Sequence, residues 1–111
     1  MSNSKFETFL GKNKQYYFHL RAKNGQIILS SEGYTSKINC KNGIESVKKN
    51  SKDNSIFETK KTKNGKYYFN LKATNGQIIG TSQMYSTEAA RNNGIKSVSE
   101  NAPIAITIEF G

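Results

Sequence analysis

The chain contains an internal repeat, and this duplication limits its fold more than any other feature of the sequence. Phe6 aligns with Phe57, and the same register continues without a gap until Ser51 aligns with Ala102. About half of the aligned positions are identical, as expected of a duplicated supersecondary unit of roughly fifty residues. Two copies are too few for an open repeat array, so the sequence predicts one closed domain with pseudo-twofold symmetry.

Each repeat predicts three strands followed by one helix. In the first repeat, residues 5–10 and 15–23 are strand-like, and Asn24-Gly25 follows them. An Asn-Gly pair between strand-forming runs favours a hairpin with a type I′ turn. The third strand then covers residues 26–31, and the second repeat shows the same order over residues 56–82.

A helix is expected after the third strand of each repeat. Thr35 or Ser36 lies where a side-chain oxygen caps the first helix, and Ser86 or Thr87 has the same place in the second. An apolar stripe along each helix is expected to pack on the sheet. It comprises Cys40, Ile44 and Val47 in the first helix and Ile95 and Val98 in the second.

Each predicted helix also contains a glycine, Gly43 or Gly94, at a position where glycine costs about 1 kcal/mol relative to alanine. Its recurrence in both copies indicates a structural reason. Either the backbone approaches the sheet closely or the helix breaks there, and close approach is the preferred interpretation.

Pro103 is expected to end the second helix, and alternating apolar residues predict a last strand over residues 104–110. The sequence thus predicts a single domain over residues 1–111. It is made of two repeats, residues 5–51 and 56–102, plus the C-terminal strand.

Several motifs of the two repeats are typical of one known family. They are Tyr16-Tyr17-Phe18-x-Leu20-x-Ala22-x-Asn24-Gly25, Ser31-Glu32-Gly33-Tyr34 and Asn42-Gly43-Ile44-x-Ser46-Val47-Lys48-Lys49-Asn50 in the first repeat, and Gly65-Lys66-Tyr67-Tyr68-Phe69-x-Leu71, Gln77-Ile78-Ile79-Gly80 and Met84-Tyr85-Ser86 in the second. On these residues nearly the whole chain resembles the YegP-like family of small bacterial proteins. The resemblance implies an α+β fold of tandem β3-α-β repeats, with an antiparallel-rich sheet, two helices on one face and the C-terminal strands exchanged between the halves. It implies no activity, because the family is uncharacterised.

The chain is strongly basic, with a formal net charge of +9. Clustered cations attract nucleic acid through counterion release. All but two of the 17 basic residues are lysine, however, whereas groove-reading proteins rely on arginine for its bidentate fork. Joint enrichment in lysine, asparagine and isoleucine is also what an AT-rich genome produces. The charge therefore leaves two interpretations open, a phosphate-binding surface or a solvated lysine surface.

The composition gives no support to a metal, a cofactor or a catalytic site. Cys40 is the only cysteine and His19 the only histidine, so neither an internal disulfide nor a Cys/His metal site is available. His19 aligns with Asn70, which cannot accept a proton, and this argues against a general base. It is expected to be a surface histidine. The first five residues are polar and no stretch approaches the roughly twenty apolar residues of a membrane span. We expect a soluble, cytoplasmic, non-enzymatic protein without membrane contact.

Alternation along the second strand of each repeat places aromatic, basic and amide side chains on one face. If the helices cover the other face, this one offers tyrosines between polar groups, an arrangement on which single-stranded bases stack. The candidate binding face consists of Tyr17, His19, Arg21, Tyr68, Asn70 and Lys72. Alternatively, the two tyrosines are ordinary sheet residues or line a dimer contact.

Lysines are densest at the predicted hairpin tips and are candidate phosphate contacts. They are Lys12, Lys14, Lys60, Lys61, Lys63 and Lys66. Solvated lysines that protect sheet edges would give the same pattern. Glu7 and Glu58, the carboxylates at aligned positions, are expected to form surface ion pairs with lysines. The predicted function is a binding or interaction module for a protein or a second copy of itself, and the alternative is weak, sequence-independent nucleic-acid binding.

Overall fold

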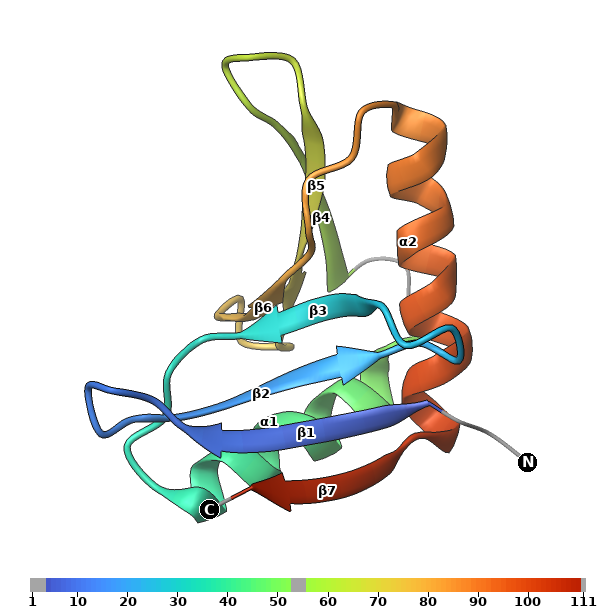
Figure 1. The fold of residues 1–111 in the computed structure, drawn as a ribbon. Coiled ribbons are helices and arrows are strands. Elements are labelled where there is room, and N and C mark those ends of the chain that lie inside the picture. Colours follow the sequence, from blue (N-terminus) through green and yellow to red (C-terminus); the bar gives the residue numbers. More distant parts are fainter. Residues whose placement is uncertain (1–3, 53–55, 111) are drawn as a thin grey trace.

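Both repeats contribute to one seven-stranded sheet that carries two helices (Figure 1). The computed structural model describes residues 4–52 and 56–110, so residues 1–3 of the polar N-terminal segment lie outside the described residues. The elements are β1 (Lys5–Leu10), β2 (Tyr16–Arg21), β3 (Ile27–Ser31), α1 (Lys37–Asn50), β4 (Phe57–Lys61), β5 (Tyr67–Lys72), β6 (Ile78–Thr81), α2 (Glu88–Asn101), the 3₁₀ turn η2 (Ala102–Ile104) and β7 (Ile106–Phe110). The α+β fold class predicted from the sequence is confirmed.

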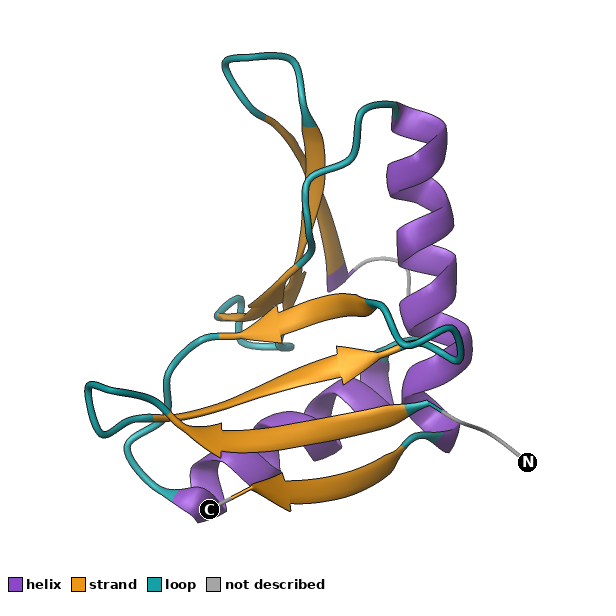
Figure 2. Cartoon of the chain, viewed as in Figure 1, coloured by secondary structure: helices purple, strands orange, loops and turns teal. Residues whose placement is uncertain are grey.

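The strand order is β4-β5-β6-β3-β2-β1-β7, and each repeat contributes three neighbouring strands (Figure 2). The third strands β3 and β6 join the repeats, with Ser30 opposite Thr81. Neighbouring strands are antiparallel with one exception, the parallel pair of β1 and β7, which makes the sheet mixed. The sheet is therefore continuous through both repeats.

The C-terminal strand β7 follows the second repeat but pairs with the first. Its residues Ile106 and Ile108 lie beside Lys5 and Glu7 of β1. This is the exchange of a C-terminal strand that the family resemblance implies. At the other end of the sheet, no strand within the described residues pairs with the outer edge of β4. The two ends of the sheet are therefore different.

Both helices pack on the same face of the sheet, where one apolar core forms. Leu20 and Leu29 are opposite each other on this face, and a Cβ at Gly80 would contact Leu29, so the core continues from one repeat into the other. The fully buried side chains include Phe6, Phe18, Leu20, Leu29, Ile44, Val47, Phe69, Leu71 and Val98. The opposite sheet face, called the outer face below, carries no helix (Figure 1).

The helix caps follow one pattern in both repeats. Ser36 Oγ accepts a hydrogen bond from the backbone N–H of Asn39 at 3.1 Å, and Thr87 Oγ1 accepts one from Ala90 at 3.0 Å. These hydroxyls satisfy an otherwise unpaired N–H of the first helical turn. Of the two expected cap positions in each repeat, the structure thus selects the second.

The helical glycines allow a tyrosine to approach the helix backbone. A Cβ at Gly43 would collide with the hydroxyl oxygen of Tyr34, and one at Gly94 would collide with the hydroxyl of Tyr85. Each helix continues without a break through its glycine. The interpretation as close approach is confirmed, although the approaching group is a tyrosine from the loop before the helix.

The expected type I′ turn at Asn24-Gly25 is wrong. Only Gly25 has a positive φ, of 85°, whereas type I′ requires it at both central residues. Ala22 donates a backbone hydrogen bond to Gln26 O at 2.9 Å, which closes a three-residue loop with glycine in the left-handed region. The Asn24 side chain explains the difference, because its Oδ1 accepts from the Gln26 N–H at 3.0 Å. Strand β2 therefore ends at Arg21, earlier than expected.

Candidate functional site

The residues of the candidate binding face all lie on β2 and β5, but they form two groups. Strands β3 and β6 lie between them. The strand register also places aligned residues of the two repeats in one polar row across the outer face. This row consists of Glu7, His19, Ser30, Thr81, Asn70 and Glu58.

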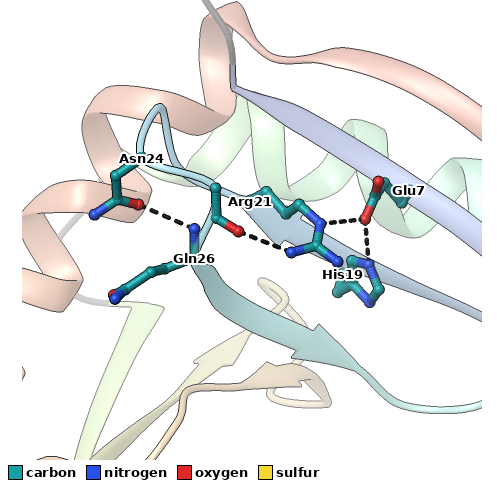
Figure 3. A network of polar contacts seen from close by, with 6 residues as sticks. Glu7, His19, Arg21, Asn24 and Gln26 are labelled. Carbon is teal, nitrogen blue, oxygen red and sulfur yellow. Dashed lines mark hydrogen bonds and ion pairs between the residues drawn. The ribbon is translucent and has the colours of Figure 1, made fainter.

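In the first repeat, Glu7 holds two cationic or potentially cationic side chains (Figure 3). Its Oε1 lies 2.5 Å from His19 Nε2 and 2.5 Å from Arg21 Nε. Arg21 also donates through Nη1 to the carbonyl oxygen of Gly25 at 2.8 Å, which ties the cluster to the β2–β3 turn. The Glu7 side chain is only 10% exposed. The expected surface pair of Glu7 with lysine is therefore wrong, because β1 and β2 pair in a register that places His19 and Arg21 beside it.

This cluster keeps Glu7 ionised. Burial raises the pKa of Glu7. Hydrogen bonds from Arg21 and His19, together with the electrostatic attraction of these two side chains, lower the pKa by a larger amount, so it lies below its ordinary value. His19, expected at the surface, has a side chain only 18% exposed and is held by this carboxylate. The contacts position the three side chains against one another, which is the arrangement of a structural ion cluster.

The second repeat builds its equivalent from weaker contacts. Lys72 Nζ lies 2.8 Å from Glu58 Oε2, and Lys60 Nζ lies 3.6 Å from Glu58 Oε1. Asn70 takes the place of His19, donating to Glu58 Oε1 at 3.4 Å and accepting from Thr81 Oγ1 at 2.8 Å. Glu58 thus forms the lysine pairs expected from the sequence. The Lys72 hydrogen bond, with smaller contributions from Asn70 and Lys60, lowers the pKa of Glu58.

The two candidate tyrosines have different neighbours on the outer face. Tyr17 lies opposite Phe9, and the two rings stack with centroids 5.7 Å apart. The Tyr17 hydroxyl accepts from Asn13 Nδ2 at 2.8 Å. Tyr68 lies opposite Lys60 instead. One side of the Tyr17 ring is therefore already occupied by an aromatic side chain.

The candidate phosphate-contacting lysines lie at two separate places. Lys12 and Lys14 are exposed in the loop between β1 and β2, and Lys63 and Lys66 are exposed in the loop between β4 and β5. Figure 1 shows these loops at different ends of the molecule. The remaining two lie on β4, where Lys60 pairs with Glu58, and Lys61 Nζ lies 5.4 Å from the centroid of the Tyr67 ring.

A further surface was not anticipated from the sequence, a groove between α2 and the outer edge of β4. It is lined by Phe57, Thr59, Asn92, Ile95, Lys96 and Ser99. A sign of this groove was present in the sequence, because each repeat has a first strand whereas the chain has one C-terminal strand. That strand can cover the outer edge of only one of the two first strands.

The part of the chain that the structure describes contains no group of three or more His, Cys, Asp or Glu side chains placed to hold a metal ion. Cys40 is buried within the core, and burial raises the pKa of its thiol. Among the described helices, neither has the length and apolar character that crossing a membrane requires.

A seven-stranded mixed sheet, built from two sequence repeats with two helices on one face, defines a small two-repeat α+β protein. The sequence model of the family described as Domain of unknown function (DUF1508) matches residues 12–58 and 62–109. The chain belongs to this family. Each matched segment contains two strands and a helix and ends within the strand that follows, β4 or β7.

Relatives of known sequence and structure agree with this assignment. The chain is 50% identical over 106 residues to a UPF0339 protein in the ptx operon 5′ region of Stutzerimonas stutzeri, covering 96% of each chain. It is 51% identical over 96 residues to the UPF0339 protein YegP of Escherichia coli, covering 86% of this chain and 87% of YegP. The solution NMR structure of a UPF0339 protein from Shewanella oneidensis superposes with a TM-score of 0.91 at 51% identity, covering 98% of this chain and 92% of that one. The NMR structure of E. coli YegP, a protein of unknown function, gives 0.93 at 45% identity, covering 98% and 94%.

Proposed function

We propose that this protein is a non-enzymatic, cytoplasmic interaction module that binds another protein across its outer sheet face. The observation that carries the proposal is an apolar and aromatic patch on this face, over β7, β1 and β2. The patch consists of Phe9, Tyr17, Ile106 and Ile108. Ile106 is 59% exposed, and the other three side chains are half-buried. Exposed apolar groups beside aromatic rings are typical of the centre of a protein interface.

The charged groups near this patch support a role in binding rather than in catalysis. Arg21 and His19 both contact the Glu7 carboxylate, and Lys72 forms an ion pair with Glu58. Because these side chains already have partners, the face offers shape and apolar area with few unpaired charges. Interface centres are depleted in charged residues for the same reason.

The test uses the full chain as bait in native lysate treated with nuclease, followed by binding measurements with the purified partner. Ile106→Glu places a charge within the patch and is expected to weaken binding by at least about tenfold. Lys49→Glu on the exposed side of α1 is the matched control, because Lys49 lies on the helical side of the sheet. A partner that binds the Ile106→Glu variant as tightly as the control would refute the outer face as the site.

Weak, sequence-independent nucleic-acid binding is the second candidate. It is supported by Lys12, Lys14, Lys63 and Lys66, which are exposed and have no ion pair among the described residues. Free lysines of this kind bind phosphates without reading sequence. Tyr68, which has Lys60 rather than an aromatic ring opposite it, is the better stacking residue of the two tyrosines.

This candidate is tested by fluorescence anisotropy with a single-stranded oligonucleotide at several salt concentrations. The logarithm of affinity should fall with the logarithm of salt, with a slope of about −0.7 for each phosphate contacted. Lys63→Glu and Lys66→Glu should each reduce that slope, whereas Lys49→Glu should not. Absent binding, or affinity independent of salt, excludes the nucleic-acid role.

A further inference from the structure

We propose that the outer edge of β4 is a binding site for an extended acidic segment of a partner protein, which adds to the sheet as an eighth strand. The site lies on a different surface from the outer-face patch, so either proposal can fail without the other.

The backbone of β4 has hydrogen-bonding groups available along this edge. The backbone N–H of Thr62 donates to Lys66 O at 2.8 Å at the turn end of the β4–β5 pair. In the antiparallel alternation, the backbone N–H and C=O groups of Lys60 and Glu58 therefore also point toward β5. The N–H and C=O groups of the alternate residues Phe57, Thr59 and Lys61 then point away from β5. Since no described strand pairs with this edge, these groups are available to an added strand.

The first repeat shows how such a strand is held. At the aligned edge of β1, strand β7 lies parallel, with Thr107 beside Phe6 and Glu109 beside Thr8. Thr107 and Glu109 line the space between β7 and α1, and Glu109 pairs with Lys41 of α1 at 3.0 Å. The strand on β1 thus uses backbone pairing, together with a carboxylate directed to a lysine of the helix.

The second repeat has the same place without a strand in it. Phe57 and Thr59 align with Phe6 and Thr8, and with α2 they line the groove described above. Asn92 and Ile95 of α2 align with Lys41 and Ile44 of α1. The groove is therefore bounded by β4 and α2, just as β7 in the first repeat lies beside β1 and α1.

Charge identifies the occupant as acidic. Lys96 aligns with Glu45 of α1, so the groove contains a cation where the first repeat has a carboxylate. Among the described residues no carboxylate lines this groove, and Lys60, Lys61, Lys63 and Lys66 lie on β4 or its turn. An added strand with glutamate or aspartate at alternate positions places one carboxylate beside Lys96, as Glu109 lies beside Lys41.

The same lysines argue against a second copy of this chain as the occupant. Two β4 edges brought together would place two lysine-rich turns at one interface, and lysines on an edge strand oppose edge-to-edge pairing of identical chains. An acidic strand reverses that repulsion and gains both backbone hydrogen bonds and ion pairs.

The experiment is an NMR titration of the full ¹⁵N-labelled protein with a blocked seven-residue peptide of alternating valine and glutamate. Saturable shifts are expected in the amides of Phe57, Thr59 and Lys61 and in those of α2 around Lys96. A peptide of alternating valine and lysine, and the acidic peptide with N-methylated alternate amides, should each bind at least about tenfold more weakly, because they lack the charge or the backbone donors. No saturable shift at millimolar acidic peptide, or shifts confined to other surfaces, would overturn the proposal.

Two variants separate the edge from general charge attraction. Thr59→Pro removes an outward N–H without disturbing the β5 pairing and should abolish the β4 shifts, while Thr59→Val, which keeps the N–H, should retain them. Lys96→Glu should weaken binding of the acidic peptide by about tenfold or more and strengthen that of the basic peptide, whereas Lys49→Glu, with the same change in net charge, should leave both unchanged. Equal binding by the Thr59→Pro variant would contradict strand addition. A concentration-dependent dimer that Thr59→Pro abolishes would assign the edge to a second copy instead.

Discussion

The first strands of the two repeats, β1 and β4, have aligned sequences but different neighbours in the sheet. β1 at one end is covered by β7, whereas β4 at the other end has a free outer edge within the described residues. The associated clusters differ as well. Glu7 is held by His19 and Arg21 with a side chain 10% exposed, while the Glu58 side chain is 33% exposed beside lysines.

This comparison shows what duplication conserves and what it leaves free to diverge. The positions that shape the core, such as Phe6 and Phe57 or Gly43 and Gly94, keep their residue types because packing depends on them. The edge and the outer face differ between the copies, because β7 covers the edge of β1 whereas no described strand covers that of β4. Paired substitutions at aligned positions measure this difference directly.

The largest contrast is expected for proline at the two aligned threonines of the edge strands. Thr8→Pro removes an N–H directed at β7 and interrupts a ladder, and should lower the free energy of unfolding by roughly 2–4 kcal/mol. Thr59→Pro removes an N–H that faces no described strand and should cost less than about 1 kcal/mol. Urea denaturation of both variants measures the difference, and equal losses would contradict the free edge of β4.

Alanine at the helical glycines should affect both repeats alike. Although alanine favours a helix by about 1 kcal/mol, the added Cβ displaces a tyrosine at a cost of roughly 1–3 kcal/mol, so a net loss of up to about 2 kcal/mol is expected. Gly43→Ala tests the contact with Tyr34, and Gly94→Ala tests that with Tyr85. Tyr34→Phe in the Gly43→Ala background should recover part of the loss in thermal denaturation. A gain in stability from either glycine substitution would show that the tyrosine moves away without cost.

The carboxylate clusters should differ in their response to pH. Since the pKa of Glu7 is lowered in the folded state, its stabilisation is present above the unfolded value of about 4.3 and is lost as pH falls through the lower folded value. Glu7→Gln should cost about 1 kcal/mol at pH 7 and flatten the stability profile below pH 5. Glu58→Gln should cost less, because its ion pairs are exposed. Urea denaturation from pH 3 to pH 7 measures both, and identical profiles would contradict the burial difference.

The smallest paired effect concerns the turns between the first and second strands. Lys14 has a φ of 65°, in the left-handed region, where the aligned Gly65 has a φ of 85°. Lys14→Gly should stabilise the fold by about 0.5–1 kcal/mol, and Gly65→Lys should destabilise it by about 1 kcal/mol. Thermal denaturation of the two variants measures these changes, and a loss of stability in Lys14→Gly would mean that the lysine side chain has a compensating contact.

Much of the fold follows from local chemistry in the sequence. Alternation identified the strands, the spacing of Cys40, Ile44 and Val47 identified the face of α1 that is buried, and hydroxyl side chains marked the helix starts. These features depend on neighbouring residues in the chain, which is why the sequence carries them. The turn at Asn24 could not be assigned by the same means, because the Asn24 side chain itself bonds to the Gln26 N–H and favours a different loop.

The site was less predictable because it depends on which strands become neighbours. Alternation places His19 and Arg21 on one face, but only the register with β1 places Glu7 between them. The free edge of β4 depends on where β7 pairs, and β7 carries no local signal for its partner. Residue patterns within one strand define a face, whereas sites arise between strands.

The parallel pairing of β7 with β1 also has a consequence during synthesis on the ribosome. Because β1 is synthesised long before β7, the outer edge of β1 stays uncovered until β7 has emerged. Closing so large a loop is entropically costly and slows the final step of folding. A chaperone that shields emerging strands would therefore act on β1 until β7 pairs with it.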